Sequence, residues 1–534
     1  MTRLVALFPL LCAALVSGET ATASNYNNVT GTSNKAFPTD VGFEGNVAYS
    51  KSPFLAQNDK VNSSQFMSCY GVETRVEPLH HQSDNATSDD IFRNLGTTSV
   101  YHSADDLFPE TKGYGPIPNQ CSVKQVHILH RHGARNPTSS ATEGAPLFGA
   151  AVWNATKAKK LQASGPLDFL NRWNYSLGAE VLVHQGAQEL FDSGVHHYYQ
   201  YAKLLDGLKH KPVFRTTSQS RMLDSARYWS LGFFGWDAPS KFHLEVLTEE
   251  SGQNNTLAPY EYCTNANEDA FYLGDELSTE WQKVYTKSAA KRLQKYVQGI
   301  KLDSTFIYGM MSLCAYETVA LGYSHFCPLF TKEEYEHYEY DIDLQFMGDY
   351  GFMNPTGRAQ GIGWVVEMLD RMNMTKFDGP ISGQNTTLDH NSTYLPVDQK
   401  LYADFTHDDV ITSVLTALNF KQFSEFLPAT KPNPNRRYRS SRVTPFAARF
   451  VLEVLDCDSD QLKGNYLRAK INEAVIPLDK DQGCEARPDG LCKLESFYQY
   501  QLKHAYKDSK YNKVCFGKNG TDFTFYGPVR NGTV

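Results

Sequence analysis

A repeated junction, in which a strand-like run leads directly into a helical run, constrains the fold more than any other feature. "KPVFRTT" (211–217) alternates like a short strand, and apolar residues recur at helical spacing in the run that follows it. "LYADFT" (401–406) precedes a second such helical run, and "VKQVHILH" (123–130) is a third strand-like run, ended by glycine and proline. Strands that alternate with helices predict an α/β fold, with a mainly parallel central sheet flanked by helices.

The chain of 534 residues is long enough for more than one structural unit. We expect the α/β domain to comprise residues 119–239 and 346–534. Residues 240–345 lack convincing strands and carry helical runs, which predicts a smaller, mainly helical domain. Residues 24–118 are rich in Asn, Ser, Thr and Asp and show little periodicity, which predicts an irregular N-terminal extension.

The first 23 residues are typical of a secretory signal peptide. An apolar run from Leu4 to Val16 follows a basic residue, and small residues suitable for cleavage extend to Ala23. No later run approaches the roughly 18 uninterrupted apolar residues of a membrane span. The sequence therefore predicts a secreted protein, extracellular or associated with the cell wall. N-linked glycans are expected at the Asn-x-Ser/Thr sites, which are Asn28, Asn62, Asn85, Asn154, Asn174, Asn254, Asn373, Asn385, Asn391, Asn519 and Asn531.

Charge and cysteine content limit the possible partners and the compartment. The net charge of −8 argues against a protein that binds nucleic acid or an anionic membrane through a broadly basic surface. Of ten cysteines, Cys12 lies in the signal peptide, which leaves nine that are widely spaced and form no C-x-x-C pair. In an oxidising compartment these cysteines predict disulfides, and the odd number leaves at least one thiol without a partner in the chain.

The segment "HILHRHGARNP" (127–137) allows three interpretations. His130 and His132 can bind zinc as a pair, but the adjacent arginines repel a dication and no nearby Cys, Asp or Glu completes the ligand set. The segment can also be a solvated basic turn with one packed histidine. A nucleophilic role accounts for more of the pattern, because a neutral imidazole can attack phosphorus while arginines bind the nonbridging oxygens.

Charged side chains accompany all three predicted strand ends. They are Arg131, His132 and Arg135 at the first, Arg215 at the second, and His407 and Asp408 at the third. In open α/β sheets, ligands bind beyond the carboxyl ends of the strands, where helix N-termini also favour anions. The sequence therefore predicts one crevice that binds a phosphate group.

These segments resemble those of the histidine acid phosphatases, and within that family the secreted fungal acid phosphatases and phytases. "RHGARNPT" (131–138) is similar to the family motif Arg-His-Gly-x-Arg-x-Pro, "FRTTSQSR" (214–221) to its middle arginine segment, and "YADFTHDD" (402–409) to its His-Asp signature. The resemblance runs from about residue 90 to the end of the chain. It implies a fold like that of the phosphoglycerate mutases and implies no cofactor.

The resemblance also implies a role for each charged residue. His132 would accept the phosphoryl group, and Asp408 would protonate the leaving oxygen. The phosphate would be bound by Arg131, Arg135, Arg215 and His407. Because an aspartic acid must be protonated to donate, we expect activity on the acid side of neutral. His130 has no family role and is interpreted as a packing residue.

Two further charged residues lie close to these motifs in the sequence, and two positions depart from the family pattern. Arg221 and Asp409 are plausible supporting groups, with helix capping or a surface position as the alternative. Cys69 lacks its usual N-terminal partner, and Asn136 stands where many relatives carry tyrosine. The resemblance implies four disulfides, which are Cys121 with Cys457, Cys263 with Cys515, Cys314 with Cys327, and Cys484 with Cys492.

The predicted function is hydrolysis of a small-molecule phosphomonoester through a phosphohistidine. Phytate is favoured as the substrate, and a broad-specificity acid phosphatase is the alternative. A catalytically silent secreted glycoprotein of the same fold is the rival from another class. The presence of both His132 and Asp408 argues against that rival.

Overall fold

The computed structural model describes residues 91–534 except 139–143, 376–378 and 380. The predicted signal peptide, Cys69 and most of the predicted extension lie outside these residues. The described end of the extension, from residue 91 to 118, is helical at residues 91–92 and otherwise consists of turns and irregular segments with one short 3-10 helix, η3 (Gly96–Thr98). No helix within the described residues is long and apolar enough to cross a bilayer.

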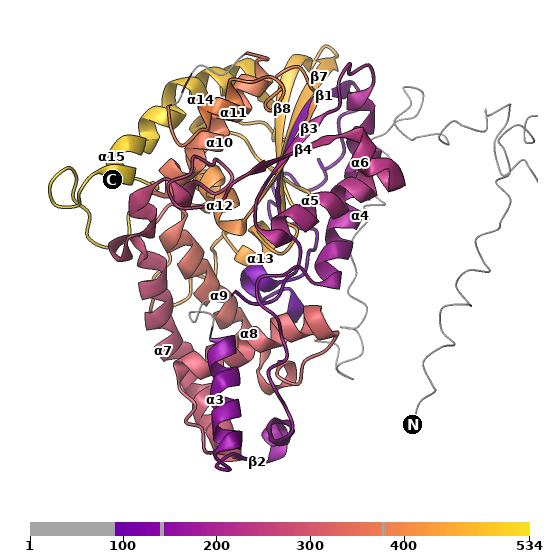
Figure 1. The fold of residues 1–534 in the computed structure, drawn as a ribbon. Coiled ribbons are helices and arrows are strands. Elements are labelled where there is room, and N and C mark those ends of the chain that lie inside the picture. The colour runs from indigo at the N-terminus through magenta and orange to yellow at the C-terminus, as the bar shows by residue number, and fades with distance from the viewer. Residues whose placement is uncertain (1–90, 139–143, 376–378, 380) are drawn as a thin grey trace, which may run out of the picture. The chain divides into compact units, whose positions relative to one another are not determined.

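An eight-stranded sheet forms the centre of the fold, in the order β10-β8-β7-β1-β6-β3-β4, with β9 paired to β8 (Figure 1). Strands β1, β6, β3 and β4 run parallel to one another, and the C-terminal strands continue the sheet in antiparallel fashion. The bounds are β1 Cys121–Arg131, β3 Val213–Thr217, β4 His243–Leu247, β6 Leu401–Thr406, β7 Arg449–Asp458, β8 Lys463–Ile471, β9 Ala474–Ile476 and β10 Cys492–Lys493. The predicted α/β class is confirmed, and its three predicted strands are β1, β3 and β6.

Helices cover both faces of this sheet. Figure 1 shows α4 and α5 on one side and α10, α12 and α14 on the other. Apolar residues of α5, including Trp229, pack on β3 and β6, and those of α12 enter the opposite core. The bounds are α4 His184–Tyr201, α5 Ser220–Phe234, α6 Ala238–Lys241, α10 Gly357–Met372, α11 Thr386–Asp389, α12 Asp408–Ala417, α13 Ser440–Val443, α14 Leu494–Ser509 and α15 Tyr511–Phe516. Helices on both faces of a sheet are typical of parallel strands in α/β folds.

The sequence pattern of residues 174–205 predicts a single helix, but α4 begins only at His184. Residues 174–183 read as the first turns of a helix, yet they are extended, because Val181 and Val183 pair through backbone hydrogen bonds with Asn136 and Ala134. This pairing joins the segment after β1 to the start of α4. It therefore sets where Arg135 lies.

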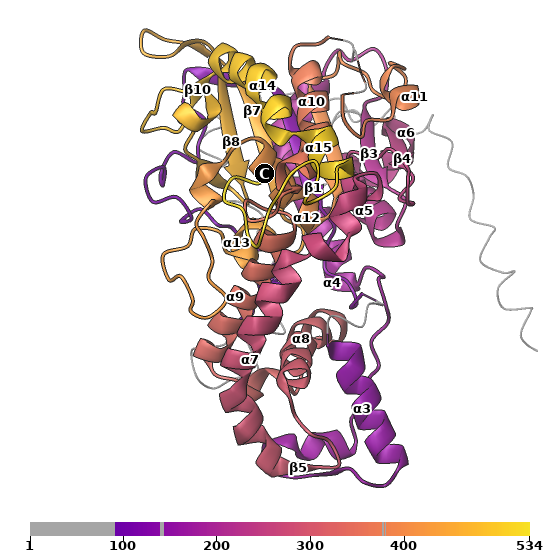
Figure 2. The same ribbon diagram turned by 90° about the vertical axis from the view of Figure 1, so that its left-hand side faces the viewer.

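Helices α3, α7, α8 and α9 lie together at one end of the sheet, with the small β2-β5 pair (Figure 2). Their bounds are α3 Ala145–Lys157, α7 Leu273–Leu293, α8 Ser304–Leu321 and α9 Lys332–Asp349, and those of the pair are β2 Gln162–Ala163 and β5 Val297–Gln298. The expectation that residues 240–345 lack strands is wrong, because β4 is the edge strand of the main sheet and pairs with β3. Alternation over only five residues made this strand hard to detect.

The four implied disulfides are confirmed. Cys121–Cys457 joins β1 to β7, and Cys263–Cys515 ties the loop after β4 to α15. Cys314–Cys327 and Cys484–Cys492 close short loops. In the chain-entropy account, the two long-range bonds constrain the unfolded chain most.

Several histidines are buried in uncharged form, and His130 is the clearest case. Its Nδ1 donates to the Arg131 carbonyl at 2.7 Å and its Nε2 lies 2.7 Å from the Ser193 hydroxyl, as expected of a packing residue. Burial lowers the pKa of His130 and that of His127 to about 3. The unfolded chain therefore binds protons first as the pH falls, and the free energy of unfolding decreases between pH 6.5 and 3.

We predict that His130→Gln makes the unfolding free energy less sensitive to acid. One proton fewer is bound on unfolding, so the slope between pH 3.5 and 6 should fall by about 1.4 kcal/mol per pH unit. Urea unfolding followed by tryptophan fluorescence measures this slope. His243→Gln, at an exposed position of β4, is the control and should leave it unchanged. If the unfolding free energy of wild type and of His130→Gln had the same slope against pH, His130 would not be buried in uncharged form.

Candidate active site

A cavity of about 250 Å³ opens at the carboxyl ends of β1 and β6 and the N-termini of α5 and α12. The sheet side contributes titratable residues from three chain segments, and α8 and α9 contribute the opposite wall. The titratable residues apart from tyrosine are His132, Arg135, Arg221, His407, Asp408 and Asp409. The cavity thus lies where strand ends and helix N-termini meet, as the α/β rule predicts.

His132 follows the last residue of β1 and is fully buried. Its backbone N–H donates to the Thr406 carbonyl at 3.2 Å, and its ring lies 5.7 Å from that of His407. Nδ1 lies 2.8 Å from the Gly133 carbonyl, which can only accept, so Nδ1 carries the proton and Nε2 keeps its lone pair. Burial, and then the charges of the nearby arginines, lower the pKa of His132 well below its usual value. The ring is therefore a neutral nucleophile with one available nitrogen.

Gly133 is needed for packing. A Cβ at this position would lie 2.4 Å from the Gly186 carbonyl oxygen of α4, closer than real contacts allow. The backbone of α4 therefore lies directly against Gly133. The glycine of the motif therefore fixes the distance between β1 and α4.

Two arginines line the cavity beside His132. Arg135 donates to the Asn136 carbonyl at 2.9 Å, and Arg221 pairs with Glu180 at 2.8 Å. Burial, and then the positive charge of Arg135, lower the pKa of Arg221. Two guanidinium groups that repel each other inside a cavity favour a bound anion, and their forks suit phosphate oxygens.

Arg215 does not lie in this cavity, contrary to the prediction. It sits within β3, fully buried, and its guanidinium donates to Asp404 at 2.8 Å and Glu367 at 2.7 Å. Arg221, six residues further on, is in the first turn of α5, beyond the carboxyl end of the strand. The rule that ligands bind beyond strand ends already favoured Arg221, because Arg215 lies two residues inside the strand.

Arg131 holds Asp408 from behind the cavity. Its Nη2 is 2.6 Å from the Asp408 carboxylate, and its Nη1 donates to the carbonyls of Thr97 and Thr444. Arg131 is almost entirely buried and does not belong to the described lining, whereas Asp408 does. The ion pair fixes one acid relative to the β1 end that carries His132.

Glu249, which the sequence did not single out, orients His407. Its carboxylate lies 3.2 Å from His407 Nε2 and accepts a hydrogen bond from the Tyr260 hydroxyl at 2.8 Å. Burial acts to raise the pKa of Glu249, but His407 and these hydrogen bonds lower it to about 2. Glu249 follows β4, a strand that the sequence pattern did not predict. Nothing in the sequence therefore indicated that Glu249 would lie beside His407.

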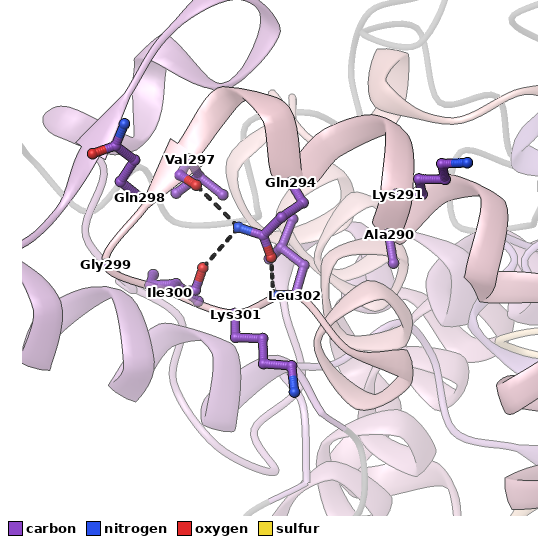
Figure 3. Close-up of a pocket in the computed structure, with 9 residues that line it drawn as sticks. All are labelled: Ala290, Lys291, Gln294, Val297, Gln298, Gly299, Ile300, Lys301 and Leu302. Atoms are coloured by element: carbon purple, nitrogen blue, oxygen red, sulfur yellow. Dashed lines mark hydrogen bonds between the residues drawn. The ribbon is translucent and has the colours of Figure 1, made fainter.

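A second hollow, between the end of α7 and the segment after β5, lacks comparable chemistry (Figure 3). The Gln294 side chain there is occupied by the loop itself, since its amide nitrogen donates to the Val297 and Ile300 carbonyls and its oxygen accepts from the Leu302 N–H. The Gln294 side chain thus stabilises the loop through these three hydrogen bonds. Its described lining holds no histidine, cysteine or carboxylate that could act with the two lysines there, so the hollow lacks the groups of a catalytic site.

The fold and the cavity define an anion-binding α/β enzyme with a buried, neutral histidine beside paired arginines. Residues 122–472 match the histidine phosphatase superfamily (branch 2), and the chain belongs to this family, as a histidine acid phosphatase.

Curated relatives and solved structures agree with this assignment. Phytase A of Aspergillus oryzae is 35% identical over 422 residues, which cover 76% of this chain and 86% of that protein. The thiamine-repressible acid phosphatase pho4 of Schizosaccharomyces pombe is 31% identical over 435 residues, or 77% and 87% of the two chains. The phytase structure from D. castellii superposes with a TM-score of 0.66 at 24% identity, covering 85% of this chain and 94% of that one, and supports the fold.

We predict that Arg221→Ala weakens phosphate binding. Loss of one preorganised cationic donor should lower kcat/KM by about 10² to 10³ and raise the inhibition constant of inorganic phosphate. Steady-state kinetics with p-nitrophenyl phosphate measures both. Arg227→Ala, an exposed arginine of the same helix, is the matched control. Unchanged kinetics in Arg221→Ala would remove this residue from the site.

Arg215→Met should instead act on stability. The change leaves Asp404 and Glu367 short of a buried cation, which costs about 3 to 5 kcal/mol of unfolding free energy. We expect a lower thermal midpoint by calorimetry and a KM close to that of wild type for the folded enzyme. A large rise in KM with an unchanged thermal midpoint would show that Arg215 binds the phosphate after all.

Proposed function

We propose that the chain hydrolyses phosphomonoesters through a phosphohistidine on His132, at acidic pH and with phytate among its substrates. One observation carries the proposal: His132 has its Nδ1 proton bound by the Gly133 carbonyl, which leaves Nε2 as the nucleophile in a cavity shared with Arg135 and Arg221. Phosphoryl transfer needs mainly positioning and charge neutralisation, and these groups supply both.

In the proposed first step, the phosphate binds between Arg135, Arg221 and His407. Nε2 of His132 attacks phosphorus in line, a P–N bond forms, and the P–O bond to the alcohol breaks. Asp408 gives its proton to the departing oxygen. Arg131, through its ion pair with Asp408, keeps that acid in place and adds positive charge behind the phosphate.

In the second step, water attacks the phosphohistidine from the side that the alcohol has left. Asp408, now a carboxylate, accepts a proton from this water, the P–N bond breaks, and phosphate is released. His132 returns to its neutral form, so the cycle uses only residues of this chain and water.

Secretion and glycosylation are part of the proposal. Four disulfides in the described residues fit an oxidising compartment. The fungal relatives and the N-terminal signal pattern add support. We expect the mature protein to carry N-linked glycans at some of its eleven sequons.

A broad-specificity acid phosphatase is the second candidate. It is favoured by the relative pho4 and by the absence of lysine from the described lining of the cavity, since phytate carries six phosphates. Phosphate release from phytate and from p-nitrophenyl phosphate, side by side at acidic pH with a chelator present, separates the two. Turnover of the aryl ester alone would exclude phytate.

We predict that His132→Ala abolishes turnover of every phosphomonoester, whereas the effect of Asp408→Asn depends on the leaving group. An alkyl phosphate needs a proton to depart, so its kcat should fall by about 10² to 10⁴. The p-nitrophenolate ion departs without one, so an initial burst of p-nitrophenol should remain in rapid-mixing experiments. Phosphate release by His132→Ala at the wild-type rate would exclude the phosphohistidine.

A further inference from the structure

The wall of the cavity formed by α8 and by α9 with its C-terminal end presents neutral hydrogen-bonding groups. It includes Tyr308, Tyr316, Tyr338 and Tyr350, with Ser312 and Gln345 between them. Within the described lining, the arginines and histidines are the four residues already assigned to the reacting phosphate. A leaving alcohol bound here would therefore meet hydroxyl and amide groups of the described chain.

Asp409 adds a second carboxyl group to the lining of the cavity, on the sheet side beside Asp408. It lies in the first turn of α12 directly after Asp408, and it lines the cavity. One carboxyl oxygen accepts from the Val410 N–H at 2.7 Å. Among the described residues the structure shows no ion pair between Asp409 and an arginine or lysine, in contrast to Asp408. Its charge therefore acts on whatever the cavity holds.

We propose that Asp409 determines substrate specificity, by favouring phosphomonoesters whose alcohol is neutral and carries free hydroxyl groups, such as sugar or polyol monophosphates, over esters with further phosphates. The inference rests on the proposed function and names its substrate class. A carboxylate accepts hydrogen bonds from hydroxyl groups, whereas a phosphate beside the reacting one would meet a like charge. The nearby tyrosine hydroxyls, Ser312 and Gln345 provide further partners for hydroxyl groups.

The discrimination should depend on pH. Asp409 is surrounded by Asp408 on its own helix, by His407 and Glu249 at the ends of β6 and β4, and by Tyr260, Tyr272 and Tyr350. Burial, and then Asp408, raise the pKa of Asp409 to about 6, while His407 opposes them. Asp409 is therefore mostly neutral at pH 4, about half ionised at pH 6 and mostly charged at pH 7, where it repels a second phosphate most.

The test compares glycerol 2-phosphate with phytate in wild type and Asp409→Asn, at pH 4 and pH 7. The measured quantity is the ratio of the two kcat/KM values. Because like charges in contact repel each other, the variant should shift this ratio towards phytate by about tenfold or more at pH 7 and by much less at pH 4. Changes in the ionisation of phytate itself cancel, because both enzymes meet the same substrate.

Asp398→Asn is the control, since it removes the same charge from an exposed position outside the cavity, and its ratio should match wild type. Asp409→Ser, whose hydroxyl can still accept from a backbone N–H of the first turn, replaces Asp409→Asn if the latter does not fold. A ratio equal to that of wild type at both pH values in the folded variant would overturn the inference. If wild type releases no phosphate from any ester, including p-nitrophenyl phosphate, the proposed function itself fails.

Discussion

The parallel pairing of β1 with β6 is the constraint on which the site depends. Arg131 and Thr406 are register partners at the ends of the two strands, so the next residues, His132 and His407, emerge side by side. The His132 N–H extends this ladder by bonding the Thr406 carbonyl. Because a slip of one residue would turn each side chain to the other face, the apolar cores on both faces protect the register of the site.

A buried ion network beneath the site reinforces this pairing. Asp404 of β6 accepts hydrogen bonds from Arg215 of β3, Arg371 of α10 and the Trp364 indole, and Glu367 of α10 completes the network. Buried ion pairs add little net stability, because desolvation offsets their attraction, yet removal of one member is costly. The network therefore specifies how β3, β6 and α10 meet. The need to hold β3, β6 and α10 together explains why Arg215 lies inside a central strand, and a role in binding substrate is not required to explain it.

The sequence was informative where a local pattern and a chemical motif coincided. Strands β1, β3 and β6, the helices after two of them, and the placing of His132, Arg135, His407 and Asp408 in one cavity were all predictable from spacing and strand ends. Arg215 was misassigned, because a one-dimensional pattern does not show that a strand residue faces buried carboxylates. The role of Glu249 could not be predicted, because its contact with His407 joins residues 158 positions apart. The start of α4 was missed because backbone pairing with Asn136 and Ala134 outweighs local helical preference.

Asp408 and Asp409 show how the fold gives adjacent carboxyl groups different environments. Both occupy the first turn of α12, where the helix dipole favours negative charge. Asp408 points back to Arg131 at the end of β1, whereas Asp409 bonds its own helix and shares the cavity with Tyr260 and Tyr350. A pair of acids held apart in this way can divide two tasks between them, with one moving a proton and the other sensing the alcohol. The chemistry then depends on the strand register, while specificity depends on the turn that follows, so the second can vary without loss of the first.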